Sequence, residues 1–170
     1  ARLAVPGGAR AIAAHRDPEM TVLVRKLLAG DTKAAGTLVA VLAETLARNI
    51  APPLPQALLR RIDGLMASIQ TQLEIQITVE DMAAETGMSV NSLISNFARA
   101  TGRTPAQYVL HQRLRRACWF LANRPLSIAE IAFATGFSSH AHLCAVFRRK
   151  LAMSPGEWRA FASGRVSCDD

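Results

Sequence analysis

The sequence has few aromatic residues and no long apolar run. Phe, Trp and Tyr together make up 5% of the 170 residues, and β-branched runs are short, so a β-rich fold is not favoured. No stretch approaches the roughly 18 consecutive apolar residues that a membrane span needs. The amino-terminal segment also lacks the continuous apolar core of a secretory signal. We therefore expect no membrane-spanning segment and no secretory signal.

Cysteine is scarce as well. Cys118, Cys144 and Cys168 are odd in number, widely spaced and never in a C-x-x-C arrangement. This pattern argues against a disulfide framework and suits a reducing compartment such as the cytoplasm. The sequence begins without methionine, so we expect either a processed chain or a piece of a longer protein.

Helix-forming and basic residues are abundant. Half of the residues are hydrophobic, and alanine, leucine and arginine dominate, which favours helices around a sizeable core. The net charge is +7 and the isoelectric point is near 10.3. Residues 99–165 hold eleven Lys and Arg against two acids, Glu130 and Glu157. The basic excess thus belongs to one segment and indicates an anionic partner, such as nucleic acid or a membrane surface.

The first third of the chain predicts helices broken by a proline-rich link. Helices are expected over residues 17–30, 31–49 and 55–73. Asp17 is a suitable N-cap, Pro18 suits the first helical position and Gly30 follows the end. The short link predicts an antiparallel hairpin whose apolar stripe, within residues 18–48, needs covering. "APPLP" at 51–55 is the best linker candidate.

The remaining sequence contains an internal duplication. "ITVEDMAAETGMS" (77–89) aligns with "LSIAEIAFATGFS" (126–138) at an offset of 49, which becomes 50 further on. The matched pairs are Ala83/Ala132, Thr86/Thr135, Gly87/Gly136, Ser89/Ser138, Leu93/Leu143, Phe97/Phe147, Arg99/Arg149, Thr104-Pro105/Ser154-Pro155 and Tyr108/Trp158. Matches in this order, with apolar positions preserved between them, indicate a repeated structural unit.

Each repeat has the pattern of a helix-turn-helix. Thr78 and Ser127 are suitable N-caps for a short first helix. Gly87 and Gly136 can take the positive φ that a sharp turn needs. The second helix carries an apolar pair four residues apart, Leu93 with Phe97 and Leu143 with Phe147. One face packs back and the other stays free, as in a helix that enters a DNA major groove.

A single long helix is expected between the two units. Thr104 caps it, Pro105 occupies its first position and Pro125 ends it. Roughly eighteen residues span about 27 Å at ~1.5 Å per residue. Such a connector can hold two recognition helices about one DNA turn, ~34 Å, apart.

These motifs resemble the DNA-binding domain of the AraC/XylS family of bacterial transcription regulators, over residues 55–163. The most specific stretch is "RLRRACWFLANRPLSIAEIAFATGF", followed by His142, Phe147, "SP" at 154–155 and "WR" at 158–159. The resemblance implies an all-α fold with two helix-turn-helix subdomains, preceded here by a helical hairpin. The expected boundaries are 78–102 for the first subdomain, 104–123 for the connector and 127–152 for the second. The expected partner is double-stranded DNA and not a membrane, and neither catalysis nor a cofactor is implied.

The region before this domain departs from the family. Family members commonly carry a ligand-sensing β-barrel there, and residues 1–52 are too short for one. Their helices resemble the connecting or dimerising helices that follow such a barrel, which suggests a homodimer through residues 18–48. Two alternatives stay open: a regulator whose sensor has been removed, or one that never had a sensor.

The resemblance and the charges together predict the residues that meet DNA. Expected base contacts are Asn91, Ser92, Ser95, Ser139, His140 and His142. Expected phosphate contacts are Ser89, Arg99, Ser138, Arg148, Arg149 and Lys150. Because the first recognition helix carries short side chains where relatives carry Arg or Gln, we expect it to depend more on phosphate contacts and DNA shape.

The histidines and cysteines raise the alternative of a metal site or a nucleophile. His140 and His142, two apart on a helix, splay by about 200°, and no further ligand stands at metal-binding spacing. Cys144 has no orienting acid, and His111 lies too far from Cys118 for a direct hydrogen bond. Structural roles are therefore favoured for these residues.

Two further expectations concern the interior. Arg113 is expected to brace the two units, with Glu130 as its partner, and Trp158 and Tyr108 are expected in the core. Two rival functions are a protein-interaction module that dimerises or contacts RNA polymerase on a degenerate DNA-binding scaffold, and a small hydrolase built on Cys144 or Cys118.

Overall fold

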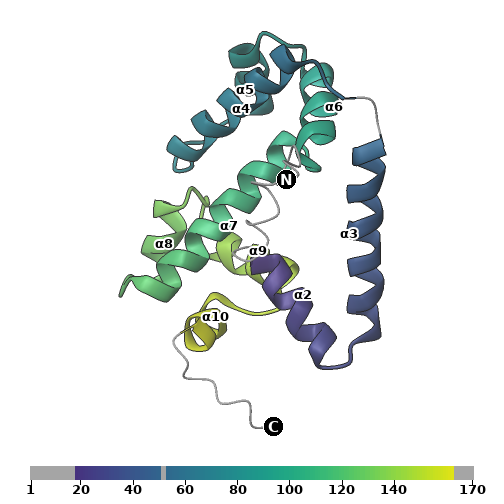
Figure 1. Ribbon diagram of the computed structural model, residues 1–170. Coiled ribbons are helices and arrows are strands. Elements are labelled where there is room, and N and C mark those ends of the chain that lie inside the picture. The colour runs from purple at the N-terminus through teal and green to yellow at the C-terminus, as the bar shows by residue number, and fades with distance from the viewer. Residues whose placement is uncertain (1–17, 51–52, 163–170) are drawn as a thin grey trace, which may run out of the picture. The chain divides into compact units, whose positions relative to one another are not determined.

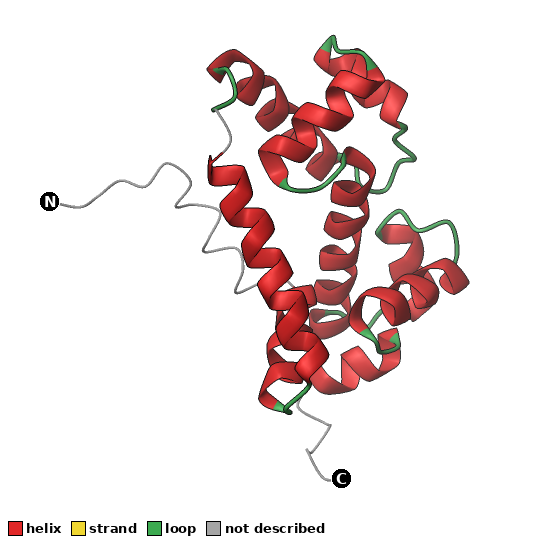
Figure 2. Cartoon of the chain, turned by 90° about the vertical axis from the view of Figure 1, so that its right-hand side faces the viewer, coloured by secondary structure: helices red, strands yellow, loops and turns green. Residues whose placement is uncertain are grey.

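The computed structural model describes residues 18–50 and 53–162, and the regular structure within these ranges is entirely helical (Figures 1 and 2). The helices are α2 (Pro18–Leu28), α3 (Thr32–Ile50), α4 (Gln56–Thr71), α5 (Val79–Thr86), α6 (Val90–Thr101), α7 (Pro105–Asn123), α8 (Ile128–Ala134), α9 (His140–Leu151) and α10 (Pro155–Ala162). The all-α prediction is confirmed. None of these helices combines the length and apolar character of a membrane-crossing segment.

The chain divides into two compact regions, an amino-terminal region of residues 1–42 and a carboxy-terminal region of residues 43–170, with the division inside α3. In the amino-terminal region Gly30, at φ +82°, separates α2 from α3. The Asp31 carboxylate accepts a hydrogen bond of 2.9 Å from the Lys33 amide and so caps α3. The expected cap at Asp17, the segment before it and residues 51–52 of the linker lie outside the described residues.

The carboxy-terminal region is built along α7. Helices α5 and α6 contact its amino-terminal half and carry α4, and helices α8 and α10 contact its other half and carry α9 (Figure 1). The first half has a core made of Ile62, Leu65, Ile69, Leu73, Met82, Ala83, Leu93, Phe97 and Val109. The other half of α7 buries Leu114, Ala117, Cys118 and Leu121 along with residues of α8, α9 and α10. One helix therefore contributes to the interior of both halves.

The apolar pairs of the two repeats are confirmed as core residues. Leu93 and Phe97 of α6 and their counterparts Leu143 and Phe147 of α9 are all fully buried. Trp158 is buried too, and its indole NH donates to the Cys118 carbonyl at 3.3 Å. Its counterpart Tyr108 is half-buried and packs edge-on against Phe97, with ring centroids 5.4 Å apart.

The duplication extends to the helix caps. Four helices begin with a capping box, in which a hydroxyl accepts from the amide three residues on, and the side chain of that residue accepts in return. The pairs are Thr78 with Asp81, Ser127 with Glu130, Thr104 with Gln107 and Ser154 with Glu157. These four boxes form two repeat-related pairs, so the same local sequence starts the same helix in each unit.

The capping bonds also stabilise the charged form of three carboxylates. Hydrogen bonds from the hydroxyl and the amide of Thr78 lower the pKa of Asp81, and those of Ser127 lower the pKa of Glu130. The amide and the hydroxyl of Ser154 lower the pKa of Glu157, with a smaller contribution from the charge of Arg148. These three side chains are therefore anionic caps at helix amino termini, where the helix dipole favours negative charge.

The turn of each helix-turn-helix adopts the expected backbone conformation. Gly87 has φ +60° and Gly136 has φ +79°, both in the left-handed region. The buried hydroxyls of Thr86 and Thr135 donate to carbonyls of the preceding turn, 2.9 Å to Met82 and 2.6 Å to Ile131. The first helix of each helix-turn-helix therefore ends at an equivalent threonine and glycine.

Candidate nucleic-acid interface

The exposed face of α6 carries those residues of this helix that are predicted to meet DNA. Asn91, Ser95 and Arg99 are spaced by four residues and are all exposed, so they lie along one side of the helix, one turn apart. Ser92 is exposed beside them, while Leu93 and Phe97 are buried on the other side. The core contacts of α6 thus leave a polar face open along its whole length.

The amino terminus of α6 is held by its own hydroxyls. Ser89 is the N-cap, and its hydroxyl oxygen accepts from the Ser92 amide at 3.3 Å. Ser92 in turn accepts from the side-chain amide of Asn96 at 3.1 Å. Each serine keeps a hydroxyl hydrogen that can be donated to a phosphate oxygen or a base acceptor. A helix amino terminus also attracts anions, which suits Ser89 to a phosphate contact.

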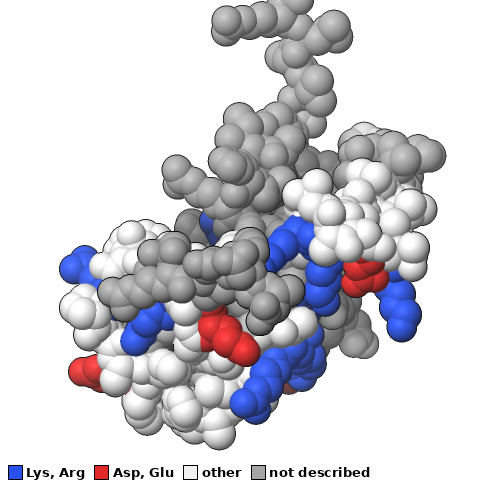
Figure 3. Space-filling model, turned by 90° about the horizontal axis from the view of Figure 1, so that it is seen from below, with Lys and Arg blue, Asp and Glu red and all other residues white. Residues whose placement is uncertain are grey.

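Helix α9 presents the corresponding face in the second unit. His142, Arg148, Arg149 and Lys150 are exposed, and Leu143, Val146 and Phe147 are buried behind them. Basic residues therefore fill the last turn, near the carboxyl end of the helix dipole. On the face of the molecule in Figure 3, Lys and Arg side chains cover more of the described surface than Asp and Glu side chains do.

The structural counterpart of Ser89 is Ser139. Ser139 is the N-cap of α9 and accepts from the His142 amide at 3.1 Å, as Ser89 does from Ser92. The sequence alignment pairs Ser89 with Ser138 instead, so Ser138 is the extra residue of the second unit. Ser139 is half-buried and its oxygen serves the cap, which leaves its hydroxyl hydrogen for a DNA contact.

The two histidines of α9 have different neighbours. The Nδ1 atom of His142 lies 3.0 Å from the Ser138 hydroxyl, and its ring packs edge-on against Phe137. Nε2 is then the ring nitrogen that can meet a group outside the chain. His140 instead pairs through Nε2 with the Cys144 sulfur at 3.5 Å. Across the part of the chain that the structure describes, no three His, Cys, Asp or Glu side chains gather in a metal-binding arrangement.

Sequence reasoning missed two small residues of this face. Ala141 and Ala145 are exposed and stand fifty residues after Asn91 and Ser95, at equivalent positions of the second recognition helix. A methyl side chain in the major groove can contact the methyl group of thymine. The repeat offset carries the signal that identifies these positions, although neither residue is polar or charged. His140, by contrast, corresponds to the half-buried Val90.

A third candidate for a DNA contact that sequence reasoning missed is Arg61 of α4. A Cβ atom added at Gly87 would lie 2.9 Å from the Nη2 atom of Arg61, so this guanidinium rests against the turn that leads into α6. Arg61 is exposed. Its guanidinium lies beside Gly87, which is two residues before the N-cap Ser89. No sequence pattern links α4 to this turn, because the contact arises only from packing.

The geometry matches known DNA-binding domains. Residues 82–160 match a family model described as a helix-turn-helix domain. The solved DNA-binding domain of AdpA, determined in complex with a target DNA, is 33% identical with a TM-score of 0.59, and the match covers 61% of this chain and 94% of that one. The chain belongs to the AraC/XylS family. An AraC-type regulator from Chromobacterium violaceum is 29% identical with a TM-score of 0.57, over 61% and 93% of the two chains.

Curated members of the AraC/XylS family are longer than this chain. The MmsAB operon regulatory protein of Pseudomonas aeruginosa is 30% identical over 98 residues, which are 58% of this chain and 32% of that protein. The activator RhaS of Klebsiella pneumoniae is 31% identical over 58% of this chain and 36% of its own length. The chain therefore spans about a third of the length of the curated relatives it matches.

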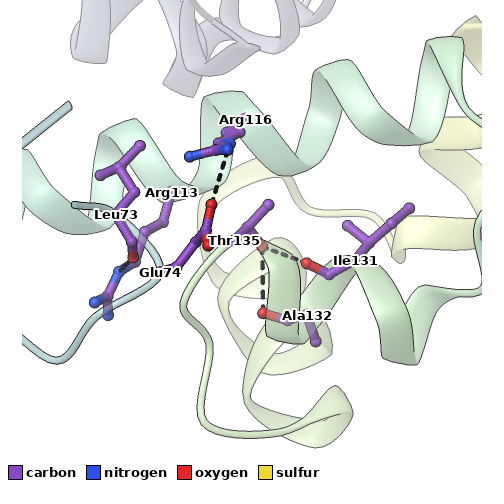
Figure 4. Close-up of polar contacts among 7 residues, drawn as sticks. All are labelled: Leu73, Glu74, Arg113, Arg116, Ile131, Ala132 and Thr135. Atoms are coloured by element: carbon purple, nitrogen blue, oxygen red, sulfur yellow. Dashed lines mark hydrogen bonds and ion pairs between the residues drawn. The ribbon is translucent and has the colours of Figure 1, made fainter. Parts of the chain in front are cut away.

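Arg113 of this AraC/XylS-type domain braces the two units, but not through Glu130. Its Nε atom donates to the Leu73 carbonyl at 2.9 Å (Figure 4). Its Nη2 atom donates to the Ile75 carbonyl at 2.7 Å. Glu130 is engaged instead with Ser127 in its capping box. The prediction of a Glu130 partner is wrong, because backbone carbonyls brought close by tertiary packing meet the buried guanidinium. Burial lowers the pKa of Arg113.

Proposed function

We propose that this chain is a sequence-specific transcription regulator that reads a bipartite DNA site. The supporting observation is the pair of repeat-related helices, α6 and α9, each with one buried and one exposed face. Helix α6 packs directly on one half of α7, whereas α9 packs on α8 and α10, which contact the other half. The nineteen residues of α7 span about 28 Å, close to the ~34 Å of one DNA turn. The two exposed faces therefore suit successive major grooves on one side of the duplex.

The two recognition helices offer different groups to the bases. On α6, Asn91 can bond an adenine edge with its side-chain amide, with Ser92 and Ser95 beside it. On α9, His142 offers a polar group and Ala141 and Ala145 offer methyl groups. His140 and Ser139 lie at the amino-terminal end of this helix and are further base contacts. Phosphate contacts come from Ser89, Arg99, Ser138, Arg148, Arg149 and Lys150. Such a regulator acts on the nucleoid in the bacterial cytoplasm.

The rival functions have less support. The protein-interaction alternative depends on the short side chains of α6, yet these lie on an open face equivalent to that of α9. The hydrolase alternative needs a reactive cysteine, whereas Cys118 is buried beneath Trp158 and Cys144 is half-buried beside His140. Contact with RNA polymerase stays a prediction.

Selection from a random duplex library tests the proposed function. Purified protein is incubated with the library at low and at physiological salt, and the retained duplexes are sequenced. We expect enrichment of two short elements about ten base pairs apart, centre to centre. One element alone would mean that a single helix reads bases. Salt-sensitive retention without enrichment would contradict sequence-specific binding, since it is the signature of phosphate contacts alone.

We also propose that residues 18–48 mediate a homodimer. Within the amino-terminal region, Leu28 is 85% exposed and Leu42 is 53% exposed, and Val24, Val39 and Val41 are exposed as well. An apolar face of this kind is more stable when a second copy covers it. Analytical ultracentrifugation should show a dimer for the unaltered chain and a monomer for the L28E/L42E double variant. A monomer in both, at tens of micromolar protein, would overturn this proposal.

A further inference from the structure

The loop between α4 and α5 contacts α7 through a buried cation. Arg113 is only 8% exposed, and its guanidinium bonds two carbonyls of this loop, those of Leu73 and Ile75. The Nε and Nη2 hydrogens of an arginine point in parallel, so one side chain can bind both carbonyls at once. The loop belongs to the first half of the domain, because Leu73 is part of the core that contains Leu93 and Phe97.

The same loop also touches the second half. Gly136, in the turn between α8 and α9, packs so closely that a Cβ atom there would lie 2.0 Å from the Leu73 carbonyl oxygen and 2.7 Å from Arg113 Nε. The side-chain amide of Gln76 donates to the Gly136 carbonyl at 3.4 Å. Arg113 and the loop therefore form a contact between the turn of the second helix-turn-helix and the body of the first.

This contact restricts motions that α7 alone would allow. A connector helix fixes the separation of two units, but each unit could still tilt about its own contacts with the helix. The Arg113 contact adds a second attachment away from the helix axis. An exposed ion pair between Arg116 and Glu74, at 3.0 Å, joins the same loop to α7 but is expected to contribute little (Figure 4).

We propose that Arg113 is a positioning residue that sets the spacing between the two DNA elements this protein accepts. The proposal rests on the bipartite binding proposed above. One inserted base pair moves one element by about 3.4 Å and rotates it by about 34–36° relative to the other. A rigid pair of recognition helices rejects that change, because the DNA or the protein must deform to restore both contacts. A loosened pair accepts it.

The test compares the spacing preference of the full chain with that of Arg113→Met. The best selected duplex is remade with one or two base pairs added or removed between its elements, and with each element alone. We expect the unaltered protein to bind its native spacing about tenfold or more tightly than the altered spacings. For R113M the preference should fall to about threefold or less, with affinity for single elements within about twofold of the unaltered protein.

Two further variants separate positioning from general destabilisation. Arg115→Met removes the same charge from the same helix, and its side chain bonds Gln112 rather than the loop, so the spacing preference should persist. Arg113→Lys keeps the charge but lacks the parallel pair of donors, so it should also lose the preference. If R113M does not fold, as judged by circular dichroism, R113K decides the outcome.

Each result bears on one proposal or on both. An unchanged spacing preference in folded R113M, or in R113K, would overturn the positioning role and leave bipartite binding intact. A loss of preference in R115M equal to that in R113M would overturn it too, since a general effect of charge would then explain both. If the unaltered protein itself shows no spacing preference, the bipartite site is refuted and the positioning role with it.

Discussion

Replacement of Gly136 by alanine is expected to destabilise the protein by about 2–5 kcal/mol, the sum of two effects. The backbone there has φ +79°, a conformation that costs an alanine roughly 1–2 kcal/mol. The added methyl group would also overlap the Leu73 carbonyl oxygen at 2.0 Å. This neighbour is backbone and cannot rotate away, so the turn must shift, at a further cost of about 1–3 kcal/mol.

Gly87→Ala is the matched control, because it changes the equivalent glycine of the first unit. Its φ is +60°, so the conformational cost is similar, but the nearest atom to an added Cβ is the tip of the flexible Arg61 side chain. We expect a loss of about 1–2 kcal/mol for G87A. Urea unfolding followed by circular dichroism measures both. Equal losses would contradict the close contact between the second turn and the Leu73 carbonyl.

The features that local chemistry controls were predictable from the sequence. Thr78 and Ser127 cap helices as expected, since each has an acid three residues on that completes the capping box. Gly87 and Gly136 take positive φ because the turn requires it. The buried pairs on α6 and α9 followed from their spacing of four residues. In each case the residues that determine the structure lie within one helical turn of it.

The features that depend on packing between distant segments were not predictable in this way. Arg113 was expected to meet an acid, as a cation usually does, but it meets carbonyls of a loop about forty residues earlier in the chain. Arg61 rests on a turn that belongs to other helices. Ala141 and Ala145 were missed for another reason: an alanine carries no chemical signal, and only its position in the repeat reveals the face it occupies.

Replacement of Arg148 and Arg149 by alanine is expected to weaken DNA binding about tenfold to a hundredfold at physiological salt. Both side chains are exposed in the last turn of α9, and Arg149 repeats the position of Arg99 on α6. A cation that binds a phosphate releases counterions. The plot of log affinity against log salt should therefore become shallower by about 0.9 for each phosphate that the variant no longer neutralises, or about 1.8 for the double variant.

Arg124→Ala controls for the loss of positive charge. Arg124 is exposed at the end of α7, outside both recognition helices, and its guanidinium lies 5.6 Å from the ring centre of Trp119. Because R124A removes one cation, it is compared with the single variant R149A. The DNA affinity of both is measured by fluorescence anisotropy over a range of salt concentrations. A shallower salt dependence for R149A but not for R124A would place the phosphate contact on α9. Equal changes would mean that both residues act only through the net charge of the protein. An unchanged slope in the double variant would mean that the carboxyl end of α9 does not contact DNA.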